Sequence, residues 1–231
     1  MIQNYNDFRT ALLKAGFSTA VGSHGDIFTL VPYSWNQEPP DAPIRWHTGD
    51  PDTDPWEWRL RVLDEESGIA YAKVFSSKGG YITREWYPSF LAVRRGGISF
   101  ADAYADGTIS HFAKRIYEAV SAHHSLPLDE IKRLAGFSRE DKSKFDRALT
   151  ELQMKLYLTV CGTWQKTSQT GEPYGWASTV FCTTELFWGK DLFDQAEKLC
   201  PEEAVQKITE QVLTLNPLAQ EKKVLTFIKG I

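Results

Sequence analysis

The chain has 231 residues and a formal net charge of −4, and 42% of its residues are hydrophobic and 13% aromatic. This length and apolar content predict a packed globular protein with one large domain or two small ones. The net acidity excludes a surface that is basic throughout, so any contact with nucleic acid has to rest on a local patch.

Cysteine usage and hydropathy indicate the compartment. The three cysteines form no Cys-x-x-Cys pair, which favours a reducing environment. No apolar run approaches the roughly 18 residues that span a bilayer, and the N-terminus lacks a basic segment followed by an apolar one. We therefore expect a cytoplasmic protein without membrane contact, and no pattern in the sequence fixes its oligomeric state.

Residues 1–107 predict an N-terminal α+β region. Residues 5–15 have the spacing of an amphipathic helix that ends at Gly16, and residues 27–31 resemble a short strand that leads into a proline-rich loop. Asp54 is expected to cap a second helix, with Pro55 as its first residue and Glu57 completing a capping box. Residues 70–75 fit either a strand or a short helix.

A third predicted helix follows Thr83 and stops at the paired glycines 96 and 97. We expect its Phe90 and Leu91 to share one core with Trp56 and Leu60 of the preceding helix.

Two neighbouring blocks of this region carry opposite charge. Residues 41–66 hold eight acids and three bases, whereas residues 73–95 hold five bases and one acid. Either the two blocks pair with each other across the fold, or Arg84, Arg94 and Arg95 form a surface with nearby aromatic rings for phosphate contact and base stacking.

Residues 108–184 predict a winged-helix domain. Apolar residues recur at helical spacing after Ser110, from Leu128 to Gly136 and again after Ser138. Two strand-like runs, 157–161 and 174–184, flank a polar loop and are expected to pair antiparallel. In a winged helix the third helix enters a DNA groove and the hairpin is the wing beside it. The same arrangement also serves for dimerisation or protein docking.

The polar face of this third helix and the wing carry further bases. Residues 139–166 hold six bases and four acids, and Arg147 lies opposite the apolar stripe of its helix. We expect the residues that contact phosphates to be among Arg84, Arg94, Arg95, Lys144, Arg147 and Lys166. The alternative is that they are ordinary solvated or paired charges.

The remaining residues, 185–231, predict a C-terminal helical extension with helices at 191–199, 201–215 and 221–229. The expected fold class is therefore α+β and mostly helical.

No cofactor or metal site is expected from the motifs. The five histidines form no HExxH pattern, and the chain has no nucleotide-binding glycine loop and no Gly-x-Ser-x-Gly elbow. Trp46, His47 and Trp86 are candidates for lining a pocket.

The chain resembles the bacterial proteins called AlkZ-related over nearly its whole length. The segments that carry the resemblance are Trp46-His47-Thr48-Gly49, Asp54-Pro55-Trp56, Arg84-Glu85-Trp86-Tyr87-Pro88, Arg94-Arg95-Gly96-Gly97, Gly136-Phe137, Leu152-Gln153-Met154 and Gly171-Glu172-Pro173-Tyr174-Gly175-Trp176. The resemblance implies a distant kinship with winged-helix DNA glycosylases that excise alkylated bases.

The catalytic pattern of those glycosylases is missing from this chain. They hold the hydrolytic water with a glutamine followed two residues later by a glutamine or an aspartate, and none of the nine glutamines here has either at that position. Glu57 and Glu85, which lie next to tryptophans, are candidate acids for activating water, although each is explained more simply as a carboxylate in the opening turn of a helix.

The sequence therefore predicts a winged-helix protein that binds double-stranded DNA. The alternatives are a glycosylase-like base-excision enzyme and a protein-docking adaptor.

Overall fold

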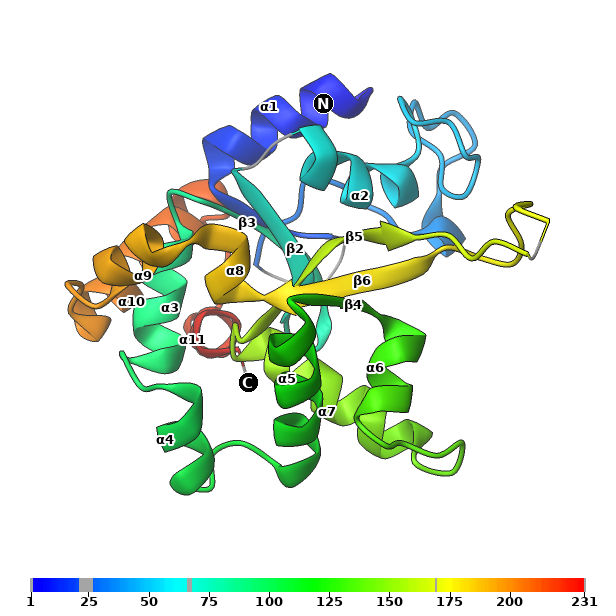
Figure 1. Ribbon diagram of the computed structural model, residues 1–231. Coiled ribbons are helices and arrows are strands. Elements are labelled where there is room, and N and C mark those ends of the chain that lie inside the picture. The colour runs from blue at the N-terminus through cyan, green and yellow to red at the C-terminus, as the bar shows by residue number, and fades with distance from the viewer. Residues whose placement is uncertain (1, 21–26, 66–67, 169, 231) are drawn as a thin grey trace.

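The computed structural model describes residues 2–20, 27–65, 68–168 and 170–230. A six-stranded antiparallel sheet of order β1-β3-β2-β5-β6-β4 runs through the molecule, with helices above and below it in Figure 1. The strands are β1 (Phe17–Thr19), β2 (Ile69–Phe75), β3 (Lys78–Thr83), β4 (Ser125–Pro127), β5 (Leu158–Trp164) and β6 (Ser178–Thr183).

The helices are α1 (Tyr5–Ala15), a short 3-10 helix (Trp35–Gln37), α2 (Pro55–Glu65), α3 (Tyr87–Arg95), α4 (Phe100–Ala105), α5 (His111–His123), α6 (Leu128–Leu134), α7 (Lys142–Met154), α8 (Thr184–Trp188), α9 (Lys190–Ala196), α10 (Pro201–Leu215) and α11 (Glu221–Lys229). About half of the residues lie in helices, which confirms the α+β class. None of the described helices is both long and apolar enough to cross a membrane.

Several elements lie where local sequence signals predict them. α1 ends at Gly16, whose φ of 88° is the left-handed conformation that a glycine cap adopts readily. The Ser110 hydroxyl caps α5 by accepting a hydrogen bond from the amide of Ala113. The two last helices have the predicted bounds, and the predicted antiparallel pairing of the hairpin is confirmed as β5 and β6.

Two expectations about short elements are corrected, and one undecided segment is assigned. Residues 27–31 do not form a strand, and only a single bridge joins Thr29 to Thr19. Residues 125–127, expected as the opening turn of a helix, instead form β4, which pairs with β6. Pairing with a distant strand overrides the local turn signal there. The undecided segment 70–75 is a strand, β2.

The predicted shared core of α2 and α3 is wrong. Trp56 is 42% exposed, whereas Trp58 is fully buried and Phe90 lies in a different apolar cluster. Asp54 does cap α2, through its carboxylate and the amide of Trp56, but the Asp54 amide donates to the carbonyl of Asp50 rather than completing a capping box with Glu57. Residues 56 and 60 have helical spacing, and so do residues 58 and 62. Periodicity alone therefore did not show which face of α2 is buried.

The sheet continues across the predicted boundary at residue 107. β2 pairs with β5, with Tyr71 opposite Val160, so strands from residues 69–83 and 125–183 form one sheet. The buried Gln153 side chain of α7 reinforces this junction, because its oxygen accepts the amide of Lys73 at 2.9 Å and its nitrogen donates to the carbonyl of Leu149. The C-terminal helices complete an apolar cluster with the N-terminal region, in which Phe227 stacks on Phe75.

Candidate nucleic-acid interface

The hairpin and the three helices before it pack around one apolar cluster. Along the chain the elements follow as α5, β4, α6, α7, β5 and β6, and β6 lies between β4 and β5 in the sheet. The fully buried members of the cluster include Ile116, Ile131, Phe145 and Leu152, one or two from each helix. The three helices therefore pack against a hairpin that lies within the sheet, between β2 and the edge strand β4.

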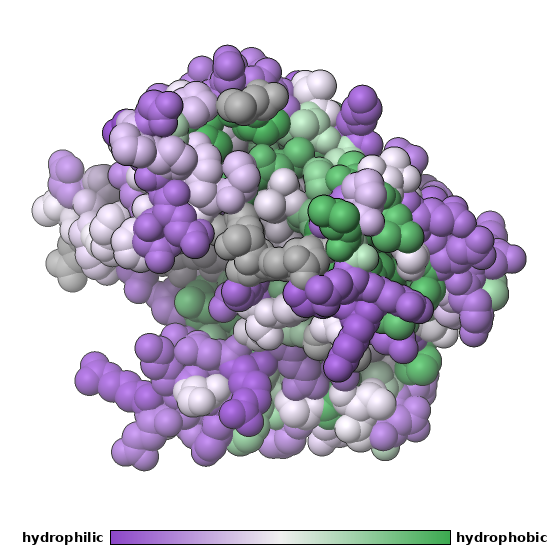
Figure 2. Space-filling view, turned by 180° about the vertical axis from the view of Figure 1, so that it is seen from behind, coloured by the Kyte–Doolittle hydropathy of each residue, from purple (hydrophilic) through white to green (hydrophobic). Residues whose placement is uncertain are grey.

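The third helix of this unit, α7, is divided into a buried face and an exposed one. Phe145, Leu149 and Leu152 point into the cluster, as their spacing predicts. Lys142, Ser143, Asp146 and Arg147 are exposed. Seen from behind, hydrophilic side chains gather at the lower left, the side to which the half-turn brings α6 and the start of α7, and apolar residues gather in the upper centre and right among further hydrophilic surface (Figure 2).

Arg147 is an exposed cation on that face. It lines an open groove of about 450 Å³ with Ser77, Thr150 and Lys155. Within the described part of the chain, the Arg147 side chain makes no hydrogen bond or ion pair, and neither do those of Arg139 and Lys142. Lys144 is different, because its ammonium is 2.9 Å from the carboxylate of Asp141. These unpaired guanidinium and ammonium groups are free to meet an anion.

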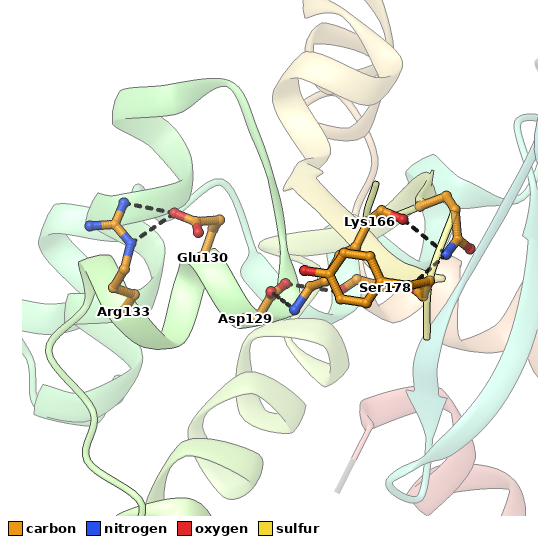
Figure 3. Close-up of polar contacts among 7 residues, drawn as sticks. Asp129, Glu130, Arg133, Lys166 and Ser178 are labelled. Carbon is orange, nitrogen blue, oxygen red and sulfur yellow. Dashed lines mark hydrogen bonds and ion pairs between the residues drawn. The ribbon is translucent and has the colours of Figure 1, made fainter. Parts of the chain in front are cut away.

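The root of the hairpin loop is fastened to α6 by polar contacts (Figure 3). The Lys166 ammonium is 2.5 Å from the Asp129 carboxylate, and the Ser178 hydroxyl donates to the same carboxylate at 3.2 Å. Burial raises the pKa of Asp129, but the hydrogen bonds from Lys166, from its own backbone amide and from Ser178 outweigh that effect and lower it. Asp129 therefore stays ionised and holds both ends of the loop beside α6.

The loop between β5 and β6 presents aromatic rings to solvent. Trp164 is 46% exposed, Tyr174 54% and Trp176 95%. The Gln165 side chain donates to the carbonyls of Tyr174 at 2.9 Å and Gly175 at 3.2 Å, so the two sides of the loop are joined near these rings. In Figure 1 this loop and the N-terminal end of α7 project toward the same side of the molecule.

The charge of this unit differs in sign from that of the chain. Residues 111–183 contain ten Lys and Arg residues and eight Asp and Glu residues, a net charge of +2 in a chain whose total is −4. Four of these cations, Lys114, Arg133, Lys144 and Lys166, are paired with acids of the same unit. Three of the cations without an acid partner, Arg139, Lys142 and Arg147, lie just before α7 or in its first half.

Arg84, Arg94 and Arg95 lie on α3 or just before it, and the structure does not group them with the exposed face of α7. Arg94 is half-buried and donates to the carbonyls of Val74, Met154, Phe227 and Ile228, at 2.7 to 2.9 Å. Its donors are therefore committed to the backbone of three elements.

The Arg95 side chain is 10% exposed and forms an ion pair with Glu185 at 2.7 Å. Its guanidinium lies over the Tyr157 ring at 4.3 Å, and both charged groups line a cavity of about 410 Å³. Arg84 is exposed and its guanidinium donates to the carbonyl of Trp188 at 3.4 Å. Sequence reasoning missed Glu185, because no spacing signal connects residues 90 positions apart.

The aromatic candidates of the N-terminal region are not brought together. Trp46 and His47 are neighbours in the loop before α2, where the His47 ring lies 5.1 Å from that of Trp56. Trp86 belongs to another cluster, in which it packs edge-on against Phe17. These residues do not form one pocket.

Glu57 and Glu85 are placed on two different elements. Glu57 is half-buried in the first turn of α2, and Glu85 is exposed before α3. Neither is among the residues that line the four cavities described for the protein. Among the described residues, no group of three His, Cys, Asp or Glu side chains is arranged to hold a metal ion.

Comparisons with known proteins place the chain in a family. A family model described as AlkZ related matches residues 2–229. No curated protein matches the chain. Among solved structures, the chain is similar to the Streptomyces sahachiroi DNA glycosylase AlkZ, with 13% sequence identity and a TM-score of 0.41 over 76% of this chain and 50% of that one.

Proposed function

The chain belongs to the AlkZ-related family, and from that premise we propose that residues 111–183 form a winged helix through which the protein binds double-stranded DNA. The order of the elements, which is helix, short strand, two further helices and a hairpin, supports the winged-helix assignment. In this proposal α7 enters the major groove and the loop between β5 and β6, the wing, contacts the adjacent backbone.

One observation carries the proposal. An exposed α7 face with the unpaired cations Lys142 and Arg147 lies in the same rigid unit as a wing held to α6 by Lys166 and Asp129. Phosphate contacts need accessible cations in a fixed arrangement, because they position a protein on the duplex. Of the predicted contacts, Lys144, Arg147 and Lys166 belong to this unit. Arg94 contributes by supporting the C-terminal end of α7, where it bonds the carbonyl of Met154.

Affinity for a labelled duplex, measured at several salt concentrations, tests the proposal. Neutralising one phosphate contact lowers the slope of log K against log salt by roughly 1. We expect this decrease for Arg147→Ala and Lys142→Ala. Lys190→Ala is the matched control, since it removes the same charge from an exposed residue of α9 and should leave the slope unchanged.

The wing makes a different contribution that the same assay separates. Trp176 is almost completely exposed and carries no charge, so Trp176→Ala should lower the affinity without changing the salt slope. An unmodified protein that binds no duplex at low salt would end the DNA-binding proposal and favour the docking adaptor. Release of free base from alkylated DNA would instead support the base-excision alternative.

A further inference from the structure

A cavity of about 410 Å³ lies between α3, α8, α9 and the loop that follows α3. The three helices lie together at the left of Figure 1. The volume is near the lower end of the range of about 300–1,000 Å³ that is typical of small-molecule sites, so the cavity suits a small ligand. Its lining residues come from outside residues 111–183, and the proposed contact with DNA does not use them.

One wall of this cavity holds an ion pair. The Arg95 guanidinium is 2.7 Å from the Glu185 carboxylate, and it lies over the ring of Tyr157 at 4.3 Å and that of Phe193 at 5.2 Å. The contact with Glu185 uses one of the five N–H donors of the guanidinium. Both members of the pair line the cavity. A ligand there can therefore contact a cation and a carboxylate that lie side by side.

Much of the remaining wall is apolar. Leu91, Ala92, Ile98, Phe193 and Ala196 line it. Ile98 is a large apolar residue and is nevertheless 46% exposed, so the chain itself leaves this side chain partly uncovered. An apolar group of a ligand that packs against Ile98 is removed from water together with it, which favours binding.

The charges of the wall disfavour a ligand with a single charge. Two cations, Arg95 and Lys190, and three acids, Glu185, Asp194 and Glu197, line the cavity. A lone carboxylate bound to Arg95 would lie beside the Glu185 carboxylate, and a lone ammonium bound to Glu185 would lie beside the Arg95 guanidinium. Each arrangement brings like charges together. A ligand that carries both charges places an opposite charge on each member of the pair.

We propose that this cavity binds a small zwitterion with an apolar side chain, the chemistry of an apolar α-amino acid. The ligand carboxylate accepts hydrogen bonds from Arg95, because a guanidinium matches the planar geometry of a carboxylate. The ligand ammonium donates to Glu185, and the apolar side chain packs against Ile98 and Phe193. The proposal does not rest on DNA binding, so either can fail without the other.

Four probes test this chemistry on the intact chain. Amide NMR spectra recorded at pH 7 give the dissociation constants of L-phenylalanine, of 3-phenylpropionate, which lacks the ammonium, of 2-phenylethylamine, which lacks the carboxylate, and of glycine, which lacks the side chain. We expect L-phenylalanine to bind at least about tenfold more tightly than each of the others, since each has lost one of the three contacts. The amides that shift should include those of Arg95, Ile98 and Glu185.

Three variants locate the site. Glu185→Gln keeps the size of the side chain and removes its charge, so it should weaken L-phenylalanine binding at least about tenfold and abolish the preference over 3-phenylpropionate. Ile98→Ala should weaken L-phenylalanine binding and leave the weak binding of glycine unchanged. Glu203→Gln is the matched control, because Glu203 is an exposed acid of α10 that does not line the cavity. The amide spectrum of each variant also shows whether it is folded.

Two results would overturn the proposal. One is that millimolar L-phenylalanine shifts no amide of the cavity wall in the unmodified protein, or binds folded Glu185→Gln as tightly as the unmodified protein. The other is that 3-phenylpropionate or 2-phenylethylamine binds as tightly as L-phenylalanine, because a single charge would then be sufficient.

Discussion

The half-buried guanidinium of Arg94 offers the sharpest test of how this fold is stabilised. It joins four carbonyl oxygens: one on β2, one at the end of α7 and two near the end of α11. The last carbonyls of a helix lack partners within the helix and form its negative end, so a cation there is stabilised. Burial lowers the pKa of Arg94 to about 9, which still leaves it charged at neutral pH.

Arg94→Ala removes these hydrogen bonds and leaves four carbonyl oxygens without these donors. The contributions of the four hydrogen bonds are not additive, water can replace some of them at a half-buried site, and the protein no longer bears the cost of desolvating the cation. We therefore expect a decrease of about 1–3 kcal/mol in the free energy of unfolding, the range for leaving a buried hydrogen-bonding group without its partner.

Urea unfolding followed by circular dichroism measures this decrease as a lower midpoint at an unchanged slope. Arg84→Ala is the control, because Arg84 is exposed and its loss should change the free energy of unfolding by no more than about 0.5 kcal/mol. Limited proteolysis adds a local readout, since α11 loses two contacts and should be cleaved earlier than in the unmodified protein. A decrease below about 1 kcal/mol for Arg94→Ala would show that the four contacts do not stabilise the fold.

Two further predictions concern Gly16 and the Lys166–Asp129 ion pair beside the β5–β6 loop. Gly16→Ala places a methyl group 2.2 Å from the Trp86 ring at a φ of +88°, so strain and overpacking together should lower the free energy of unfolding by roughly 2–4 kcal/mol. Gly107→Ala, with a φ of +72° and no atom within 4 Å, isolates the strain at roughly 1–2 kcal/mol, and equal losses for the two variants would contradict the packing argument. Lys166→Met should raise the pKa of Asp129, measured by carbon NMR. Because the pKa of Asp129 is lowered in the folded state, the Asp129 carboxylate stabilises the fold above about pH 4, and this stabilisation is lost as the pH falls through the folded-state pKa. If Lys166→Met left the titration of Asp129 unaltered, the ion pair would be refuted.

Local sequence signals predicted where the helices end better than they predicted which face of each helix is buried. Caps such as Ser110 and Gly16 act within a few residues, so the sequence around them is sufficient to place a helix end. The buried face of α2 depends on which of two equally spaced stripes meets the rest of the fold. Trp58 is buried there against Phe8 of α1, whose ring stacks on it at 5.0 Å, and no local signal contains that contact.

The role of Arg94 was, by contrast, encoded in the sequence. It lies four residues after Phe90 and three after Leu91, both buried, so helical periodicity places it on the inward face of α3. Its charge favours the interpretation as a phosphate contact, yet its position in the stripe indicates burial. When a cation lies in the apolar stripe of a helix, its place in the stripe predicts its burial better than its charge predicts its exposure, provided that carbonyl acceptors lie near it.

The same contacts explain why a DNA-binding unit would need the rest of this chain. The C-terminal half of α7 is fixed from outside the three-helix unit, by Gln153 bonded to β2 and by Met154 bonded to Arg94. Its N-terminal half is anchored in the three-helix unit by the buried Phe145, and the opposite face of that half, which carries Arg147, is exposed to solvent. A helix held firmly at one end can present the other in a fixed direction, and phosphate contacts depend on such positioning. The N-terminal region and the C-terminal helices therefore act as the support from which α7 extends, and the proposed interface should weaken when that support is loosened, even at residues that never touch DNA.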